Sequence, residues 1–235
     1  MHHVLMDQWS QGSSPLHARD PRAKILVLLA FLIVLATTAP NAFLALTIYA
    51  VVLVAGILIA GLPAASLLLR AMAVLPFSLT FGLISWLAGD RLRAMGLVEK
   101  SYLSTVAALL VVGTTPLPLL LSGLRALGTP RLLVLVGQFL YRYLFVVSEQ
   151  AQHLRLAAAC RRGTESRRRS DFRAAAGALA ILFARSYYRA EGIHRAMMAR
   201  AFSGKFELLR RIEFRLADGL FTLAIAGFLI LVRIQ

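Results

Sequence analysis

The feature that most constrains this chain is a series of uncharged, apolar runs long enough for a lipid bilayer. Ile25–Ala39 holds 15 such residues, and Ala42–Gly61 holds 20 after a turn at Pro40 and Asn41. A helix needs about 20 residues to cross the hydrocarbon core. Two further runs have the same character, Ala71–Ala88 and Ser101–Leu121, and a fifth, Leu216–Val232, is marginal because Asp218 lies near its start. The sequence therefore predicts an all-α integral membrane protein with about five transmembrane helices.

The composition agrees with this class of protein. Hydrophobic residues make up 59% of the chain and charged residues only 16%, whereas charged residues are about a quarter of a soluble domain. Cys160 is the single cysteine, so no disulfide can form within the chain. The polar N-terminus lacks the apolar core of a signal peptide, and we expect no cleavage there.

The charge is unevenly distributed, and its distribution predicts an orientation. The net charge is +15, and residues 161–215 hold 14 Lys and Arg against 5 Asp and Glu. Positively charged loops stay on the cytoplasmic side of a membrane. The same rule places the N-terminal cations Arg19, Arg22 and Lys24 in the cytoplasm. Because an even number of spans, four, separates them from residues 161–215, both basic segments can lie on that side. The fifth span then leaves the C-terminus outside.

The pattern changes between the fourth and fifth runs, where apolar stretches contain arginines. No proline follows Pro130, so long unbroken helices are allowed there. We expect helices over roughly 131–160 and 172–202, joined by the polar hinge RRGTESRRRSD. The predicted division is a cytoplasmic N-terminal segment (1–24), a four-span part (25–121), a cytoplasmic helical region (122–215) and a final span (216–235).

The stretch RAEGIHRAMMARAFSGKF predicts an amphipathic helix with a small apolar face and a basic rim. The face follows the 3.6-residue period, with Arg189 and Arg200 at its edge; its members are Ala190, Ile193, Met197 and Ala201. One interpretation is a helix lying among lipid headgroups. The other is a helix that docks on a protein, since Met suits surfaces that must repack. The pattern alone does not separate them.

A second helix ends in a similar way and favours docking. In LRLAAACRRGTES, small residues precede Arg161, Arg162 and then Gly163, which suits a helix C-cap. Arg162 and Arg200 are 38 positions apart. Two similar tips predict two similar receptors, such as the halves of a dimeric partner. The candidate docking residues are Arg161, Arg162, Gly163, Met197, Met198, Ala199, Arg200 and Ala201.

Several other functions lack their motifs. Gly204 and Lys205 are followed by Phe206 rather than Ser or Thr, so there is no phosphate-binding loop. No metal-binding motif occurs. A membrane-embedded enzyme would need clustered carboxylates or a nucleophile beside a base, and the sequence shows neither pattern. A nucleic-acid binder would need aromatic residues interleaved with the basic ones, and these are sparse in the basic segment. The first four predicted spans hold no charged residue, which argues against an ion path.

Two stretches carry a resemblance to a known family. GSSPLHARDPRAKILVLL and FARSYYRAEGIHRAMMARAFSG resemble the T component (EcfT/CbiQ family) of energy-coupling-factor transporters, most closely the CbiQ-like type of cobalt and nickel uptake systems. That family carries two Ala-Arg-Gly signatures at the ends of coupling helices. Here the signatures read Arg161-Arg162-Gly163 and Ala199-Arg200-Ala201, and each departs at one flanking position.

The resemblance implies a non-catalytic coupling subunit of an ATP-driven importer in the bacterial inner membrane, with its N-terminus and coupling helices in the cytoplasm. It implies two ATP-binding ATPase subunits, which bind ATP and Mg while this chain binds no cofactor. A separate CbiM-like membrane subunit would bind the substrate, with room for a small CbiN-like subunit. Membrane lipids are further neighbours, and nucleic acid is not expected. Cobalt or nickel is the favoured cargo. One alternative is a T component for a vitamin such as biotin, and another is that the chain is a membrane-embedded enzyme.

Overall fold

The computed structural model describes residues 9, 12, 14–39, 42–161, 168–202 and 216–234, and these contain helices but no strand. Five helices are long and apolar enough to cross a membrane, which confirms the predicted all-α membrane fold: Phe43–Ala60, Ala64–Leu87, Arg91–Gly113, Arg131–Cys160 and Leu216–Arg233. The chain forms two compact units, Met1–Thr129 with Arg211–Gln235, and Pro130–Arg210. We refer to them as the bundle unit and the hairpin unit.

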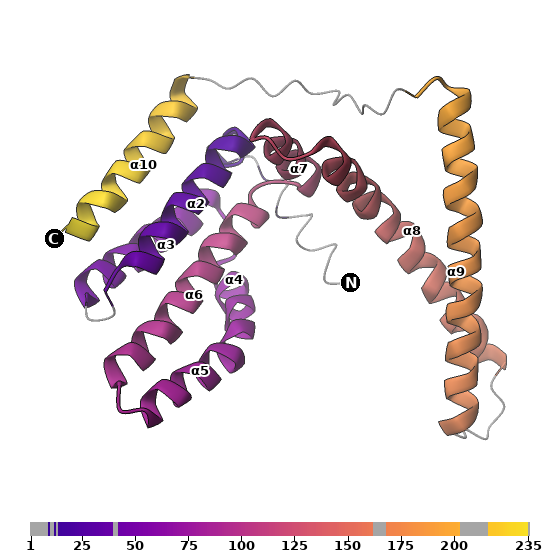
Figure 1. Cartoon of the computed structure of the whole chain (residues 1–235), viewed down its shortest axis with the longest axis horizontal. Coiled ribbons are helices and arrows are strands. Elements are labelled where there is room, and N and C mark those ends of the chain that lie inside the picture. Colours follow the sequence, from indigo (N-terminus) through magenta and orange to yellow (C-terminus); the bar gives the residue numbers. More distant parts are fainter. Residues whose placement is uncertain are drawn as a thin grey trace. The chain divides into compact units, whose positions relative to one another are not determined.

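The bundle unit is built around a tightly packed group of helices (Figure 1). Helix α2 (Pro21–Thr37) contacts α6 (Arg91–Gly113), α7 (Leu117–Ala126) and α10 (Leu216–Ile234), and α3 (Phe43–Ala60) also packs on α6. Fully buried side chains fill the space between them: Leu46, Tyr49 and Ile57 from α3, and Leu229 from α10. This unit therefore encloses its own apolar core.

Local sequence signals explain where these helices begin and end. Asp20 caps α2, because its carboxylate accepts a hydrogen bond from the Arg22 backbone N–H at 2.8 Å and Pro21 follows at the first helical position. Helix α3 ends at Gly61, whose φ of 67° is the left-handed conformation that glycine tolerates best.

Two of the predicted spans differ from the helices that form. The run 71–88 corresponds to α5 (Leu75–Leu87), preceded by the short helices α4 (Ala64–Ala71) and η1 (Met72–Val74). Helix α5 starts afresh around Pro76, because proline has no N–H to continue the preceding helix. The predicted span 101–121 is interrupted for the same reason at Pro116, between α6 and α7.

Helix α6 also begins ten residues before the predicted span, at Arg91. Asp90 caps it by accepting a hydrogen bond from the Arg93 N–H at 3.3 Å. Glu99 and Lys100 therefore lie inside this helix, so the prediction that the first four spans hold no charged residue was wrong. The Lys100 ammonium donates to the Thr38 carbonyl at the end of α2. The partly buried Lys100 ammonium thus satisfies a backbone carbonyl at the end of another helix.

The set of membrane-length helices differs from the predicted one although the number agrees. Helix α2 has 17 residues and falls just short, whereas the apolar part of α8 (Arg131–Arg161) is long enough. The predicted division into segments 1–24, 25–121, 122–215 and 216–235 stays a prediction, because packing does not locate the membrane surface.

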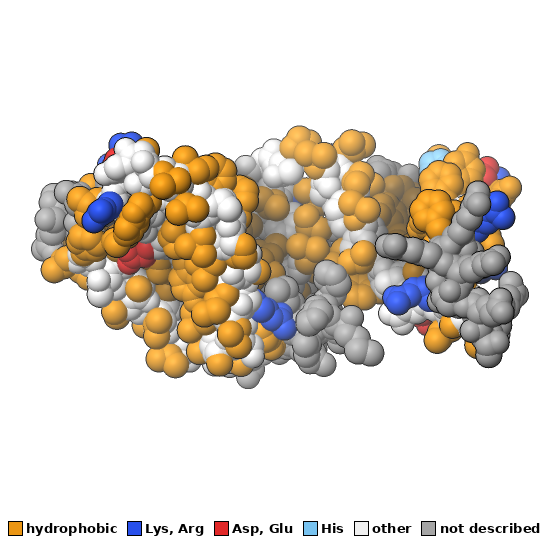
Figure 2. Space-filling view, turned by 90° about the horizontal axis from the view of Figure 1, so that it is seen from below, with side chains coloured by type: hydrophobic (Ala, Val, Ile, Leu, Met, Phe, Trp, Pro, Cys, Tyr) orange, Lys and Arg blue, Asp and Glu red, His pale blue; other side chains and the backbone are white. Residues whose placement is uncertain are grey.

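The hairpin unit consists of α8 and α9 (Arg168–Ala199), which pack against each other. The two predicted long helices are thereby confirmed. Among the described residues of this unit, Val134 is the one buried hydrophobic side chain. Across the bundle unit, exposed apolar side chains also dominate the face seen in Figure 2, with only isolated charged side chains. Such a surface suits contact with lipid.

Candidate functional site

The hairpin unit contains an open apolar groove between α8 and α9. Helix α9 turns a partly buried stripe toward α8, at the three- and four-residue spacing that keeps side chains on one helix face. The groove has a volume of about 510 Å³. Its lining is Val136, Phe139, Leu140, Tyr143, Leu144 and Val147 from α8, with Ser186, Arg189, Ala190, Ile193 and Met197 from α9.

Most of the predicted amphipathic face of α9 forms this groove wall. Ala190, Ile193 and Met197 line the groove together with Arg189, whereas Ala201, the fourth predicted member, is exposed in the turn after the helix. On the opposite wall, the rings of Phe139 and Tyr143 stack at a centroid distance of 6.1 Å. The apolar stripe therefore faces the neighbouring helix and the open groove within this unit.

The end of α9 is shaped by a Schellman turn, which returns the last free carbonyls to the chain. The Phe202 N–H donates to the Met197 carbonyl at 3.1 Å, and the Ala201 N–H donates to the Met198 carbonyl at 3.0 Å. Ala201 takes a φ of 55°, the left-handed conformation usually occupied by glycine. The family signature has glycine at this position, so the turn keeps its geometry with alanine.

This turn separates the predicted docking residues into two environments. Met197 is partly buried in the groove, whereas Met198 is 60% exposed, and Ala199, Arg200 and Ala201 are exposed. Arg195 is paired with Glu191 one turn earlier. Arg200 thus stands at the tip of the helix, where an incoming surface can reach its guanidinium.

The first predicted tip is seen only in part. Ala157, Ala159 and Cys160 are exposed along the end of α8, and Arg161 is its last residue. The side chain of Arg161, together with Arg162 and Gly163, lies outside the described residues. The similarity of the two tips therefore stays a prediction.

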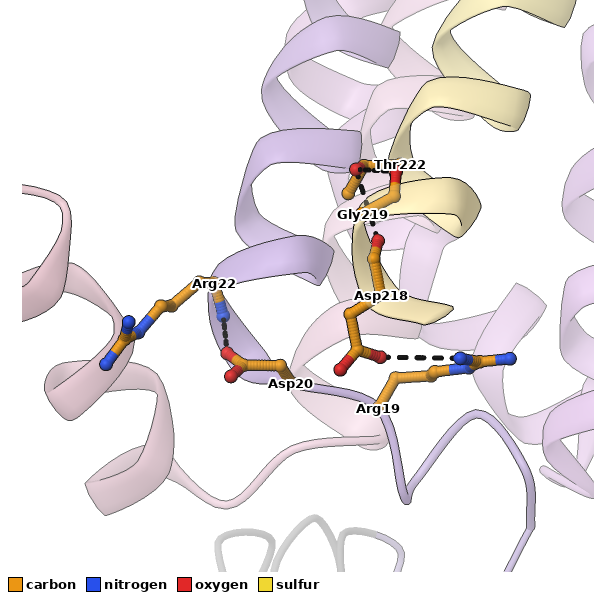
Figure 3. Close-up of polar contacts among 6 residues, drawn as sticks. All are labelled: Arg19, Asp20, Arg22, Asp218, Gly219 and Thr222. Atoms are coloured by element: carbon orange, nitrogen blue, oxygen red, sulfur yellow. Dashed lines mark hydrogen bonds and ion pairs between the residues drawn. The ribbon is translucent and has the colours of Figure 1, made fainter. Parts of the chain in front are cut away.

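A polar cluster in the bundle unit lies where α10 begins, directly after residues 203–215 (Figure 3). Arg19 contacts Asp218 at 3.4 Å, and the Asp218 side chain is only 6% exposed. The Arg19 guanidinium also lies 5.4 Å from the centroid of the Phe221 ring. The need of Asp218 for a cation can be inferred from its apolar surroundings, but Arg19 is 199 positions away and gave no sequence signal.

The described residues contain no group of three or more His, Cys, Asp or Glu side chains that could hold a metal ion. The chemistry that the site offers is recognition: a cationic tip on one side and an apolar groove on the other.

Comparison with known proteins adds family information. A family model for CbiQ, described as cobalt transport protein, matches residues 12–209. The chain is 31% identical over 117 residues to the cobalt transport protein CbiQ of Rhodobacter capsulatus, which covers 50% of this chain and 48% of that protein. It is 35% identical over 100 residues to an uncharacterized protein of Methanocaldococcus jannaschii, covering 43% of this chain and 37% of that protein. The chain thus spans less than half the length of these curated relatives.

Proposed function

The chain belongs to the CbiQ family of cobalt transport proteins, and from this membership we propose that it is the transmembrane coupling subunit of an ATP-driven energy-coupling-factor importer. The cargo in this proposal is cobalt or nickel ions, and the chain itself is not an enzyme. The observation that carries the proposal is the hairpin unit, in which an exposed arginine tip and an open apolar groove lie on the same helix pair.

The arginine tips are the proposed docking points for two ATPase subunits, which bind ATP and Mg. A guanidinium can make two parallel hydrogen bonds with a carboxylate, which gives a geometrically specific contact. Arg200 would enter a groove on one ATPase subunit, with Met198 and Ala199 adding apolar contact. Arg162 would serve the other ATPase subunit, with Arg161 and Gly163 beside it.

The groove is the proposed contact for the substrate-binding membrane subunit, a CbiM-like protein, with a small CbiN-like subunit as a further member. Its lining is apolar apart from Ser186, Arg189 and the Tyr143 hydroxyl, whereas the tip is cationic. Helix α8 is also apolar enough to lie in a membrane. Two surfaces of such different chemistry suit two different partners, one buried in lipid and one in water.

The mechanism follows from this arrangement. ATP closes the ATPase dimer and changes the distance between its two docking grooves. Helices α8 and α9 then move as levers, because each is a single unbroken helix of more than 30 residues. A packed element with two arrangements, biased by a ligand bound elsewhere, can pass this motion to the substrate-binding subunit.

The proposal is tested by copurifying the chain with its tagged ATPase partner. We expect Arg200→Ala to weaken ATPase association by about 2–5 kcal/mol, the range for truncating a buried charge at an interface. Arg195→Ala is the matched control, since Arg195 sits on the same helix but is 73% exposed and paired with Glu191. The proposal fails if the Arg162→Ala, Arg200→Ala double variant assembles with the ATPase and supports uptake like the wild type.

A further inference from the structure

A second apolar groove lies in the bundle unit, between the neighbouring helices α5 and α6. The main neighbours of α5 are α6 and η1, so most of its apolar surface is uncovered; Phe77 is 69% exposed and Leu83 is 61% exposed. The groove has a volume of about 610 Å³ and is lined by Leu75, Leu79, Leu83, Trp86, Met95 and Val98, among others. Its floor is narrow because Gly82 brings the helices together: a Cβ at Gly82 would lie 3.0 Å from a methyl carbon of Val98.

One end of this groove carries a positive charge. The Arg91 guanidinium lies 5.2 Å from the centroid of the Trp86 ring, a cation–π geometry that holds it beside the groove. Arg93 is close by, but its charge is shared with Asp90 at 3.4 Å. Within the described part of the chain, Arg91 has no ion-pair partner. Its N–H groups are therefore available to an anion at the groove end.

The groove also has a direction. Glu99 lines it eight residues further along α6, about 12 Å from Arg91 at 1.5 Å per residue. Its carboxylate repels an anion at that end. A ligand with an anionic head and an apolar tail is consequently oriented with its head at Arg91.

The residues at the charged end of the groove are of the kinds found at membrane interfaces. Trp86 and Arg91 lie together there, and tryptophan and arginine side chains are common where a membrane meets water.

We propose that this groove binds an anionic phospholipid, with one acyl chain between α5 and α6 and the phosphate on Arg91. A guanidinium binds phosphate oxygens in pairs, and the Trp86 ring beneath it holds the fork in place. A neutral lipid fills the same groove but lacks the net charge that favours Arg91. This site is separate from the coupling surface and does not rest on the proposed transport function.

The test is a lipid titration of the full-length purified chain in detergent, read by native mass spectrometry. The probes are dioleoyl phosphatidylglycerol and dioleoyl phosphatidylcholine, which have the same acyl chains. We expect the wild type to prefer phosphatidylglycerol by about tenfold, and Arg91→Gln to lose that preference. Arg93→Gln is the matched control, with the same charge change on the same turn, and should keep the preference within about twofold.

A groove variant tests the acyl-chain part. Leu79 is 54% exposed and lines the groove from α5, so Leu79→Trp fills it about two helical turns away from Trp86; we expect weaker binding of both lipids at unchanged helicity. Equal loss of preference in the Arg91 and Arg93 variants would mean diffuse attraction to the turn and would overturn the proposal. Equal binding of the two lipids by the wild type, or unchanged binding by Leu79→Trp, would overturn it as well.

Discussion

The bundle unit and the hairpin unit differ in how many of their apolar side chains they bury. In the bundle unit, α2, α3, α6 and α10 bury a continuous cluster that includes Leu46, Tyr49 and Ile57. In the hairpin unit, the described residues of α8 and α9 bury Val134 and leave an open groove of about 510 Å³. Both are rich in apolar residues, so composition does not distinguish them.

This difference in burial shows which apolar surface of the hairpin unit is available for assembly. Four helices can enclose side chains on several sides, whereas two helices share only one seam. The apolar stripe of α9 therefore cannot be fully covered by α8 alone. The bundle unit encloses a core of its own and has its open groove outside that core, on α5 and α6. The hairpin unit has almost no core among its described residues, and its open groove lies on the seam between its two helices.

The strongest test of this comparison removes core volume from the bundle unit. Leu46 is fully buried, so Leu46→Ala should lower the free energy of unfolding by about 2–5 kcal/mol through lost packing and a residual cavity. Leu58→Ala is the control on the same helix, because Leu58 is 69% exposed. Unfolding in mixed micelles with increasing dodecyl sulfate measures both. Equal losses would show that the core around Leu46 does not carry the stability of the unit.

A smaller effect is expected at the junction where α10 begins. Asp218→Asn removes the charge that contacts Arg19, and we expect a loss of about 1–3 kcal/mol because the aspartate is buried and its hydrogen bond is charge-assisted. Asp90→Asn is the control, since Asp90 and Arg93 are 48% and 68% exposed and such pairs contribute under about 1 kcal/mol. The same unfolding assay applies. An Asp218 effect no larger than that of Asp90 would contradict a structural role for the cluster.

The hairpin unit should respond in the opposite way, through assembly rather than stability. Leu140 is 68% exposed and lines the groove, so Leu140→Asn should change the unfolding free energy of the isolated chain by less than about 0.5 kcal/mol. Association with the substrate-binding subunit should fall about tenfold, because a polar amide would be buried at the contact. Leu156→Asn, also exposed on α8 but outside the groove lining, is the comparison variant. Unchanged association would remove the groove from the proposed interface.

The smallest predicted effect concerns the tip of α9. Ala201→Gly should stabilise the turn by about 1 kcal/mol, since alanine is strained at a φ of 55° and glycine is not. Ala199→Gly should have the opposite sign, because Ala199 is the last residue of the helix and glycine disfavours helical structure. Amide hydrogen exchange of the α9 end resolves the two. Slower exchange in both variants would contradict the left-handed turn.

Much of the fold could be predicted because hydrophobicity and proline act locally. The two long helices of the hairpin unit follow from the absence of proline after Pro130 and from the apolar periodicity of α9. The breaks before α5 and α7 were missed because Pro76 and Pro116 stand inside apolar runs, where hydropathy alone reads as continuous. The early start of α6 was missed because Glu99 and Lys100 looked like a boundary, although Lys100 finds its acceptor on α2.

Of the candidate site, sequence reasoning identified the groove-facing stripe of α9 and the arginine at its tip. It did not identify the α8 side of the groove, since no pattern in one helix shows which face of another lies opposite. It also could not separate Met197 from Met198: they are neighbours in sequence, but one lines the groove and the other is exposed.

The sequence by itself determined that this chain is helical, that it belongs in a membrane, and where its positive charge gathers. These properties depend on the transfer of each residue from water and on the reach of a single helix turn, so they can be read without a partner segment. Only the tertiary structure decided that Arg19 meets Asp218, that Lys100 closes α2, and that α8 and α9 leave a groove open. Each of these joins segments distant in the chain, and the free energy of such a contact exists only once packing has brought both sides together.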